Sequence, residues 1–300
     1  MSLQSFFANL YLRRQFKGRH QPTLNVPHAR ASVQAMARRY PPPPKEIRHT
    51  RVPADAARGL CPAEWLAVAQ PQRTVLYLHG GGYFFCNLDT HRPVCSYLAR
   101  AAQAQVLSVD YRLAPEHPFP AAVDDALAWY RRLLDDGIRP ESLVIAGDSA
   151  GGGLALATLL AARQAGLPLP ACALLFSPWV DLACTGETMK TLADADVMFQ
   201  PHLLPQAAAL YLNGRPATEP LASPLYADLQ GLPPLLIHAS NHEVLLADSL
   251  RLHGRAQAAG VSSELIRRDK LPHVWPTMVM LPEARASLKQ SAAFIARHTR

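Results

Sequence analysis

The chain of 300 residues lacks long apolar runs, paired cysteines and internal repeats. No run of about 18 apolar residues occurs, which argues against a membrane-spanning helix. Without a repeat, a solenoid or propeller is excluded. The five cysteines are widely spaced and contain no Cys-x-x-Cys pair: Cys61, Cys86, Cys95, Cys172 and Cys184. We therefore expect no disulfide framework, no zinc site and a reducing, cytoplasmic location.

Acidic residues are scarce in the first 60 residues, where only Glu46 and Asp55 occur. Eleven basic residues share that segment: Arg13, Arg14, Lys17, Arg19, Arg30, Arg38, Arg39, Lys45, Arg48, Arg51 and Arg58. The segment carries +9 and the rest of the chain −2, of the total of +7. It contains no nucleic-acid-binding motif, and its aromatic residues do not alternate with the basic ones. We therefore expect no nucleic-acid partner.

The first residues place apolar side chains at helical spacing: Leu3, Phe6, Phe7, Leu10 and Tyr11. An Arg-rich amphipathic start is also typical of organelle transit peptides, whereas a secretory signal would need a continuous apolar core. We favour a helix that packs this apolar face onto the body of the protein. Four prolines, Pro41 to Pro44, then form a stiff extended spacer. Residues 1–45 are thus predicted to be an N-terminal helical cap segment, followed by a catalytic domain over 46–300.

After the prolines, apolar runs alternate with helical patterns. The predicted strands are Thr74 to His79, Gln105 to Asp110, Leu143 to Gly147, Ala171 to Ser177, Leu235 to Ser240 and Ser263 to Arg267. The predicted helices are Val94 to Ala102, Ala121 to Leu134, Leu154 to Arg163 and Ser249 to Ala259. This alternation predicts an α/β fold with a mostly parallel sheet flanked by helices. Residues 184–222 contain no predicted strand and are expected to be a helical cap insertion over the ligand-binding edge.

The most informative segment is the strand that ends in Gly147-Asp148-Ser149-Ala150-Gly151-Gly152. In a Gly-x-Ser-x-Gly turn between strand and helix, the serine occupies a strained position that only small neighbours can surround. The following helix directs its first N–H groups toward charge that develops on a substrate oxygen. Ser149 is therefore the predicted nucleophile, and the N–H of Ala150 is a predicted oxyanion-hole donor.

A second glycine-rich segment, His79-Gly80-Gly81-Gly82, ends the strand that begins at Thr74. Consecutive glycines allow a ligand atom to approach the backbone N–H groups closely. By itself this segment is equally consistent with a flexible turn. Together with the serine turn, it predicts that Gly81 and Gly82 complete an oxyanion hole.

A serine hydroxyl needs a base, usually a histidine that is oriented by a carboxylate. In this arrangement the expected order along the chain is serine, acid, histidine. Glu243 follows the strand that ends at Ser240, and Asp248 lies farther on, where it suits the first turn of the next helix. His273 follows the last predicted strand. We therefore predict the triad Ser149, Glu243 and His273, with Asp248 as the alternative acid.

The chain resembles the bacterial esterases related to hormone-sensitive lipase, within the α/β-hydrolase superfamily. The matching strings are His79-Gly80-Gly81-Gly82-Tyr83, Asp89-Thr90-His91-Arg92, Asp110-Tyr111-Arg112-Leu113-Ala114-Pro115-Glu116, Gly147-Asp148-Ser149-Ala150-Gly151-Gly152 and Pro272-His273-Val274-Trp275. The resemblance implies an α/β-hydrolase body with a helical cap. It departs from the family at the acid, where Glu243-Val244-Leu245 replaces the common Asp-Pro-Leu.

Other residues receive supporting roles. Arg112 and Glu116 are expected to form an ion pair, and Asp148 to bond nearby backbone. Tyr83 and Trp179 are predicted to contact substrate, although both also suit ordinary packing. Apolar residues of the insertion, Met198 and Phe199, are predicted to line the substrate pocket.

These features predict a serine carboxylesterase that hydrolyses short- to medium-chain esters through an acyl-enzyme, with no metal or organic cofactor. The alternatives are an amidase or arylformamidase with the same machinery, and a hydrolase-fold receptor that binds a ligand without turnover. The expected partner is a small ester, without nucleic acid and without stable membrane insertion. A homodimer is left open.

Overall fold

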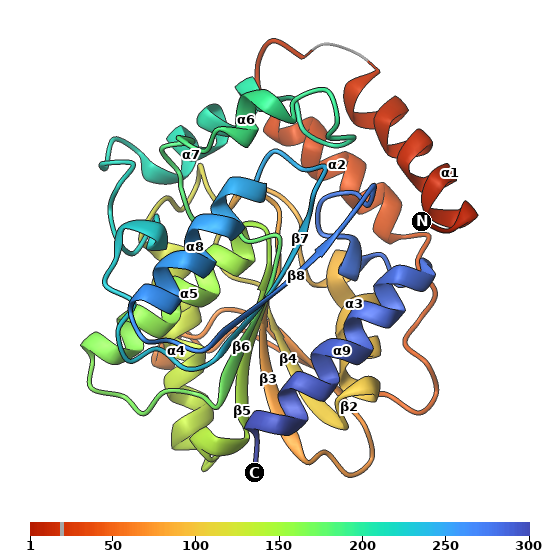
Figure 1. The fold of residues 1–300 in the computed structure, drawn as a ribbon. Helices are drawn as coiled ribbons and strands as arrows, with labels where there is room; N and C mark the ends of the chain where they lie inside the picture. The colour runs from red at the N-terminus through yellow and green to blue at the C-terminus, as the bar shows by residue number, and fades with distance from the viewer. Residues whose placement is uncertain (19–20) are drawn as a thin grey trace.

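A computed structural model describes residues 1–18 and 21–300, so Arg19 of the basic segment lies outside the described residues (Figure 1). Its sheet has eight strands in the order β1-β2-β4-β3-β5-β6-β7-β8. The strands are β1 Arg48–Val52, β2 Ala63–Ala67, β3 Arg73–Leu78, β4 Ala104–Val109, β5 Leu143–Asp148, β6 Cys172–Phe176, β7 Leu235–Ser240 and β8 Ser263–Arg268. Strand β2 pairs antiparallel with β1 and β4, and the other pairings are parallel. The predicted mostly parallel α/β fold is confirmed.

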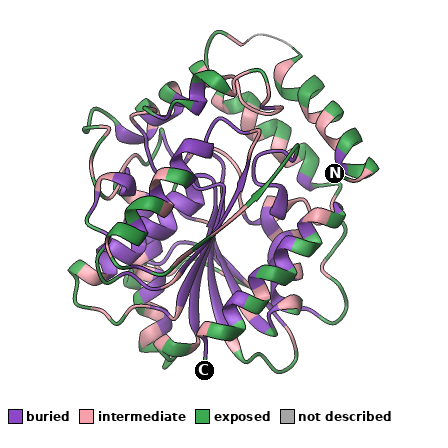
Figure 2. Cartoon of the chain, viewed as in Figure 1, coloured by how far each residue is buried: buried purple, intermediate pink, exposed green. Residues whose placement is uncertain are grey.

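Among the described residues, five helices cover the two faces of this sheet: α3 Leu88–Ala101 and α9 Pro282–His298 on one, and α4 Ala121–Asp135, α5 Ala150–Gln164 and α8 Leu246–Ala258 on the other. The helices α1 Leu3–Leu12, α2 Val26–Ala37, α6 Thr188–Thr191 and α7 Leu204–Leu212 lie at one end of the molecule (Figure 1). Alternate residues of β3 enter two separate cores. Leu76 and Leu78 pack with α4, α5 and α8, whereas Val75 and Tyr77 pack with α3 and α9. The central strands are consequently buried on both faces (Figure 2).

The first turn of helix α5 is in direct contact with strand β3 of the sheet. A Cβ on Gly151 would lie 2.0 Å from the carbonyl oxygen of Leu78, so only glycine fits at this contact between α5 and β3. The residues from Ala150 to Ala162 are all buried. The helix that follows Ser149 is therefore fixed in the centre of the molecule.

The sequence patterns did not indicate three elements. Strand β1 is an exposed edge with the polar sequence Arg-His-Thr-Arg-Val, and β2 contains the buried Glu64. Helix α9 buries Ser287 and Ser291 together with Leu288 and Phe294, which weakens its apolar stripe. Exposed polar residues in β1, and buried polar residues in β2 and α9, thus concealed these elements from a hydrophobic pattern.

Two helical segments lie together at one end of the molecule (Figure 1). The backbone N–H of Leu24 donates to Gln206, and Arg13 donates to the carbonyl of Asp194. Asp196 accepts from the N–H of Val244, which follows β7. Residues of 1–45 and 184–222 thus contact each other near the carboxyl ends of the parallel strands. We call these two segments the cap.

The prediction that α1 packs its apolar face onto the body is wrong. Leu3 and Phe7 are 76% and 63% exposed, whereas Ser5 is buried. Ser5 donates to Glu283, and Asn9 donates to the carbonyl of Lys270. Hydrogen bonds from the polar face therefore orient this helix, and they leave its apolar face outward. None of the helices in the described ranges has both the length and the apolar character needed to cross a bilayer.

Candidate active site

Ser149 lies between β5 and α5 in a conformation that non-glycine residues rarely adopt, with φ 52° and ψ −122°. Its backbone N–H donates to the carbonyl of Phe176 at 2.8 Å, and its carbonyl accepts from Trp179 at 2.9 Å. These bonds to the segment that follows β6 hold the strained turn. Ser149 is 7% exposed and lies at the N-terminus of a buried helix. The serine is thus presented in a fixed position, as the sequence pattern predicts.

The glycine segment after β3 packs directly on this turn. Gly80 donates its N–H to the Asp148 carboxylate at 3.1 Å. Gly81 has φ +113°, and a Cβ there would lie 2.1 Å from the carbonyl oxygen of Phe85, so no other residue suits this bend. The N–H groups of Gly81, Gly82 and Ala150 donate to no acceptor among the described residues. They remain available to a substrate oxygen.

Glu243 and His273 lie against each other, both almost fully buried. The Glu243 Oε1 atom accepts from the N–H of Ser240 at 2.8 Å, and Oε2 bonds Nδ1 of His273 at 2.5 Å. Nε2 of His273 is buried and has no hydrogen-bond partner among the described residues. This pairing fixes the ring and leaves Nε2 as the nitrogen that can accept a proton.

Asp248 occupies a different place. It lies in the first turn of α8, as the sequence indicates, and accepts from the backbone N–H groups of Val180 and Asp181 at 2.9 Å each. Burial raises its pKa to about 8. Its carboxyl group therefore holds the segment after β6 rather than the histidine.

Phe199 of the cap contacts the His273 ring edge to face, with centroids 4.7 Å apart and planes at 63°. The N–H groups of Met198 and Phe199 donate to Asp196 Oδ1, whose other oxygen accepts from Val244. One buried aspartate thus joins the cap to the segment that carries Glu243. Both predicted pocket residues are half-buried, and Phe199 directly adjoins the predicted base.

Tyr83 and Trp179 are each 1% exposed and belong to the core. Tyr83 stacks on Tyr211 of α7 with centroids 3.7 Å apart, and the Trp179 indole donates to the carbonyl of Asp181. Both aromatic residues pack between body and cap. Their role in substrate binding stays a prediction.

Ser177 was not singled out from the sequence, yet it connects two parts of the site. Its hydroxyl accepts from the N–H of Val274, next to His273, at 3.1 Å, and its own N–H donates to the carbonyl of His238. Both Ser177 and Val274 have positive φ, 47° and 51°. A serine directly after a buried strand is the only sequence signal for this role.

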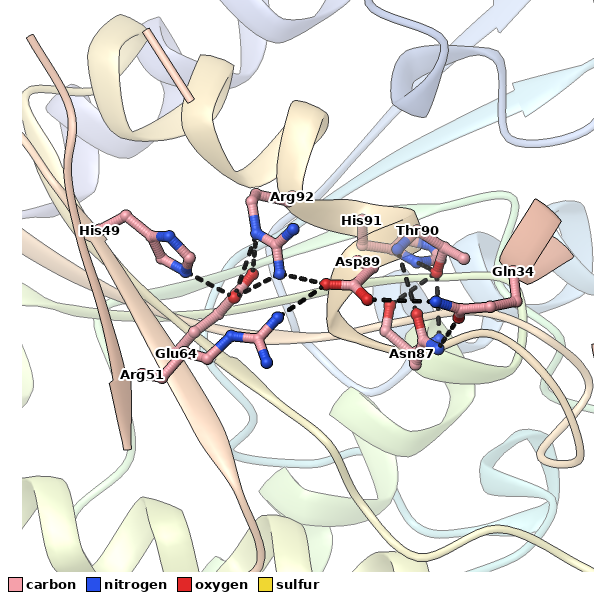
Figure 3. A network of polar contacts seen from close by, with 9 residues as sticks. All are labelled: Gln34, His49, Arg51, Glu64, Asn87, Asp89, Thr90, His91 and Arg92. Atoms are coloured by element: carbon pink, nitrogen blue, oxygen red, sulfur yellow. Dashed lines mark hydrogen bonds and ion pairs between the residues drawn. The ribbon is translucent and has the colours of Figure 1, made fainter. Parts of the chain in front are cut away.

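The Asp148 carboxylate is held by His91 and Tyr77, and His91 belongs to a larger polar network that Figure 3 shows. Nε2 of His91 lies 3.2 Å from this carboxylate, and the Tyr77 hydroxyl donates to it at 2.8 Å. Burial alone would raise the pKa of Asp148, but the charge of His91 and these hydrogen bonds hold it below the usual value. Asp148 also bonds the N–H of Gly80, so its predicted bond to nearby backbone is confirmed.

The same network reaches the edge of the sheet. Buried Glu64 of β2 pairs with Arg92 of α3 and with His49 of β1, each at 2.8 Å (Figure 3). Arg51 reaches Asp89 at 3.1 Å. The buried charge that obscured β2 in the sequence is thus fully paired.

The predicted ion pair between Arg112 and Glu116 is wrong. Arg112 pairs with Asp125 of α4 at 2.8 Å, and Glu116 pairs with Arg30 of α2 at 2.7 Å. Arg30 also donates to the carbonyls of Phe84 and Ala114. Arg112 and Glu116 are close in the sequence, which favoured pairing them. In the structure, α2 packs so that its Arg30 reaches Glu116 instead.

Comparisons with known proteins agree with this geometry. A family model described as the alpha/beta hydrolase fold matches residues 75–277. The chain is 46% identical to an "Acetyl-hydrolase" of Streptomyces hygroscopicus over 79% of this chain and 80% of that protein. It is 33% identical to an "Esterase" of Acinetobacter venetianus over 96% of this chain and 95% of that one.

Solved structures match over nearly the whole chain. The esterase EstE5, soaked with ethyl alcohol, is 42% identical with a TM-score of 0.91 and covers 99% of both chains. An esterase from the bacterial hormone-sensitive lipase family is 40% identical with a TM-score of 0.92 and covers all of both chains. Both the fold and the sequence identity extend across body and cap. The chain therefore belongs to the bacterial esterases related to hormone-sensitive lipase, within the α/β-hydrolase family.

Proposed function

We propose that this chain hydrolyses small carboxylic esters, with Ser149 as nucleophile, His273 as general base and Glu243 as the acid that orients the histidine. Membership of the family makes the chain a serine-type carboxylic ester hydrolase. The observation that carries the residue assignment is the buried pair of His273 and Glu243, 2.5 Å apart, which leaves Nε2 without another described partner.

The proposed reaction has two halves. Ser149 Oγ attacks the ester carbonyl while His273 Nε2 takes its proton, and the N–H groups of Gly81, Gly82 and Ala150 stabilise the oxyanion. His273 then protonates the departing alcohol, which leaves an acyl group on Ser149. A water molecule, deprotonated by His273, releases the acid and restores the serine.

The proposed substrates carry short to medium acyl chains. Phe199 packs against His273 and places an apolar ring beside the proposed base. The proposal includes the half-buried Met198 next to it. Such a lining favours an alkyl chain over a charged one. In this proposal residues 184–222, together with residues 1–45, form the cap over a catalytic domain of residues 46–300.

The nucleophile is tested by substitution and by labelling. Ser149→Ala should lower kcat/KM for p-nitrophenyl butyrate at least about a thousandfold. Phenylmethylsulfonyl fluoride should add its sulfonyl group to the wild-type chain and not to Ser149→Ala, as measured by intact mass. Cys86→Ala is the matched control, and it should label like the wild type. Hydrolysis by Ser149→Ala at the parent rate would refute the assignment.

Esters are proposed ahead of amides because the relatives are named as esterases and acetyl-hydrolases. Paired ester and anilide substrates with the same acyl group separate the two. A kcat/KM for the anilide equal to that for the ester would favour the amidase. Turnover of either substrate excludes a receptor without catalysis.

The proposed location is the cytoplasm. The described structure has five free cysteines, and burial raises the pKa of the Cys61 thiol to about 12. A chain that depends on no disulfide suits a reducing compartment. Fractionation of the cells that make the protein, with activity followed in each fraction, tests this placement.

A further inference from the structure

Helix α1 is docked with its polar side toward the protein. Ser2 and Ser5 both donate to the Glu283 carboxylate, and Asn9 donates to the carbonyl of Lys270 at 2.8 Å. These bonds come from successive turns of one helix face, so they fix its rotation. The opposite face is held away from the core although its residues are apolar.

This outward face is an unusually apolar surface. Its exposed fractions are Leu3 76%, Phe6 50%, Phe7 63%, Leu10 59% and Tyr11 56%. The outer side of α1 is largely exposed in Figure 2. Contiguous apolar surface of this kind usually marks a site that meets another apolar phase or partner. We call these five residues the α1 face.

A groove of about 370 Å³ continues this apolar surface toward the body. Phe6 and Leu10 line it from α1, and Val197 and Leu271 line it from the cap insertion and the segment before His273. Apolar surface therefore extends from the exposed helix to the segment that precedes the predicted base.

The charge around the α1 face distinguishes two possible partners of this surface, a second copy of the chain and an anionic bilayer. No acidic residue precedes Glu46, and the first 60 residues carry +9. Arg14 is exposed, and Arg13 and Lys270 line the groove beside the α1 face. A second copy docked through the same face would bring two strongly cationic segments together, which is unfavourable. An anionic bilayer surface instead satisfies both the apolar side chains and the cations.

We propose that the α1 face docks the enzyme onto an anionic phospholipid bilayer. Leu3, Phe7 and Tyr11 lie one helical turn apart in succession and enter the boundary between headgroups and acyl chains. Arg14 follows them and meets the phosphates. This docking is peripheral, and it requires no catalytic step.

Sedimentation with vesicles tests the proposal. The wild-type chain should bind vesicles of equal amounts of phosphatidylcholine and phosphatidylglycerol, and bind pure phosphatidylcholine weakly. The double variant Leu3→Gln, Phe7→Gln should bind the mixed vesicles at least about tenfold less tightly. Arg14→Gln should lower that affinity about fivefold, and less on pure phosphatidylcholine.

Leu250→Gln is the matched control, because Leu250 is an exposed leucine of α8, 37% exposed and outside the α1 face. It should bind like the wild type. Each variant should hydrolyse a water-soluble ester without vesicles at the wild-type rate, which shows that the site is folded. Equal vesicle binding by the wild type and the double variant would overturn the proposal. So would a wild-type dimer, seen by light scattering, that the double variant converts to monomer.

Discussion

Glu243 contacts His273 from a position where the resemblance to the family implies an aspartate. One carboxylate oxygen is held by the N–H of Ser240 and the other bonds His273 Nδ1. The glutamate side chain is one methylene longer than that of aspartate, and at this length its two oxygens meet both Ser240 and His273. Ser240 adds a further constraint, because its hydroxyl donates to the carbonyl of Leu271, two residues before the histidine.

At the residue scale, Phe199 is expected to limit acyl length. Phe199→Ala removes the ring that packs on His273 and opens space beside the reacting groups. The ratio of kcat/KM for p-nitrophenyl octanoate to that for the butyrate should rise about tenfold. Phe7→Ala, which removes an exposed ring of α1, serves as control and should leave the ratio unchanged. An unchanged ratio in Phe199→Ala would show that this ring does not border the acyl group.

The proposed catalytic residues could be located in the sequence because each follows a recognisable strand. Ser149, Glu243 and His273 come after β5, β7 and β8, whose carboxyl ends meet at one edge of a parallel sheet. Ser177 and Asp196 were not predictable. They act on backbone N–H groups of segments distant in the sequence, and such bonds leave no residue pattern.

At the element scale, Arg30 makes most of the side-chain bonds that hold α2, beside those of Gln34 to Asn87 and Asp89. Arg30 bonds two carbonyl oxygens and forms a bidentate pair with Glu116. Arg30→Met should therefore lower the free energy of unfolding by about 1–2 kcal/mol. Urea denaturation measures this value.

Arg58→Met is the matched control for Arg30, because Arg58 forms only an exposed pair with Asp55. Loss of this exposed ion pair in Arg58→Met should change the free energy of unfolding by about 0.5 kcal/mol or less. An equal effect of the two variants would mean that the bonds from Arg30 do not hold α2 in place.

Helix α1 and strand β2 show why a hydrophobic pattern in the sequence does not determine how an element is placed in the fold. The apolar stripe predicted the helix but not its rotation, which Ser5 and Asn9 set through distant acceptors. In β2, a glutamate at position 64 indicates an exposed residue from the sequence alone. In the structure Glu64 is buried because it pairs with Arg92 and His49. The local pattern therefore gave the existence of α1 but not its orientation, and for β2 the tertiary partners of Glu64 were needed to explain the strand itself.

At the scale of the whole molecule, Asp248 couples stability to pH. Burial raises its pKa to about 8, whereas an unfolded aspartate titrates near about 4. The folded chain thus binds more protons between these values, and the contribution of Asp248 to stability falls as pH rises from about 4 to about 8. Asp248→Asn keeps an acceptor for the N–H groups of Val180 and Asp181 without the titration.

The stability of Asp248→Asn relative to the wild type should therefore increase with pH across that range. Urea unfolding at several pH values measures the difference, with the exposed Asp135→Asn as control. A difference that stays constant, or that decreases as pH rises, would contradict the assignment of a protonated Asp248.

The most direct test of the catalytic assignment compares kcat/KM for p-nitrophenyl butyrate in Glu243→Gln and Asp248→Asn. Each change replaces one buried carboxyl group by an amide of similar volume. Glu243→Gln should lose about a thousandfold or more, because the amide no longer holds the histidine in its reactive form. Asp248→Asn should stay within about threefold of the wild type, since Asp248 binds only backbone N–H groups. The reverse order, with the larger loss in Asp248→Asn, would contradict the account.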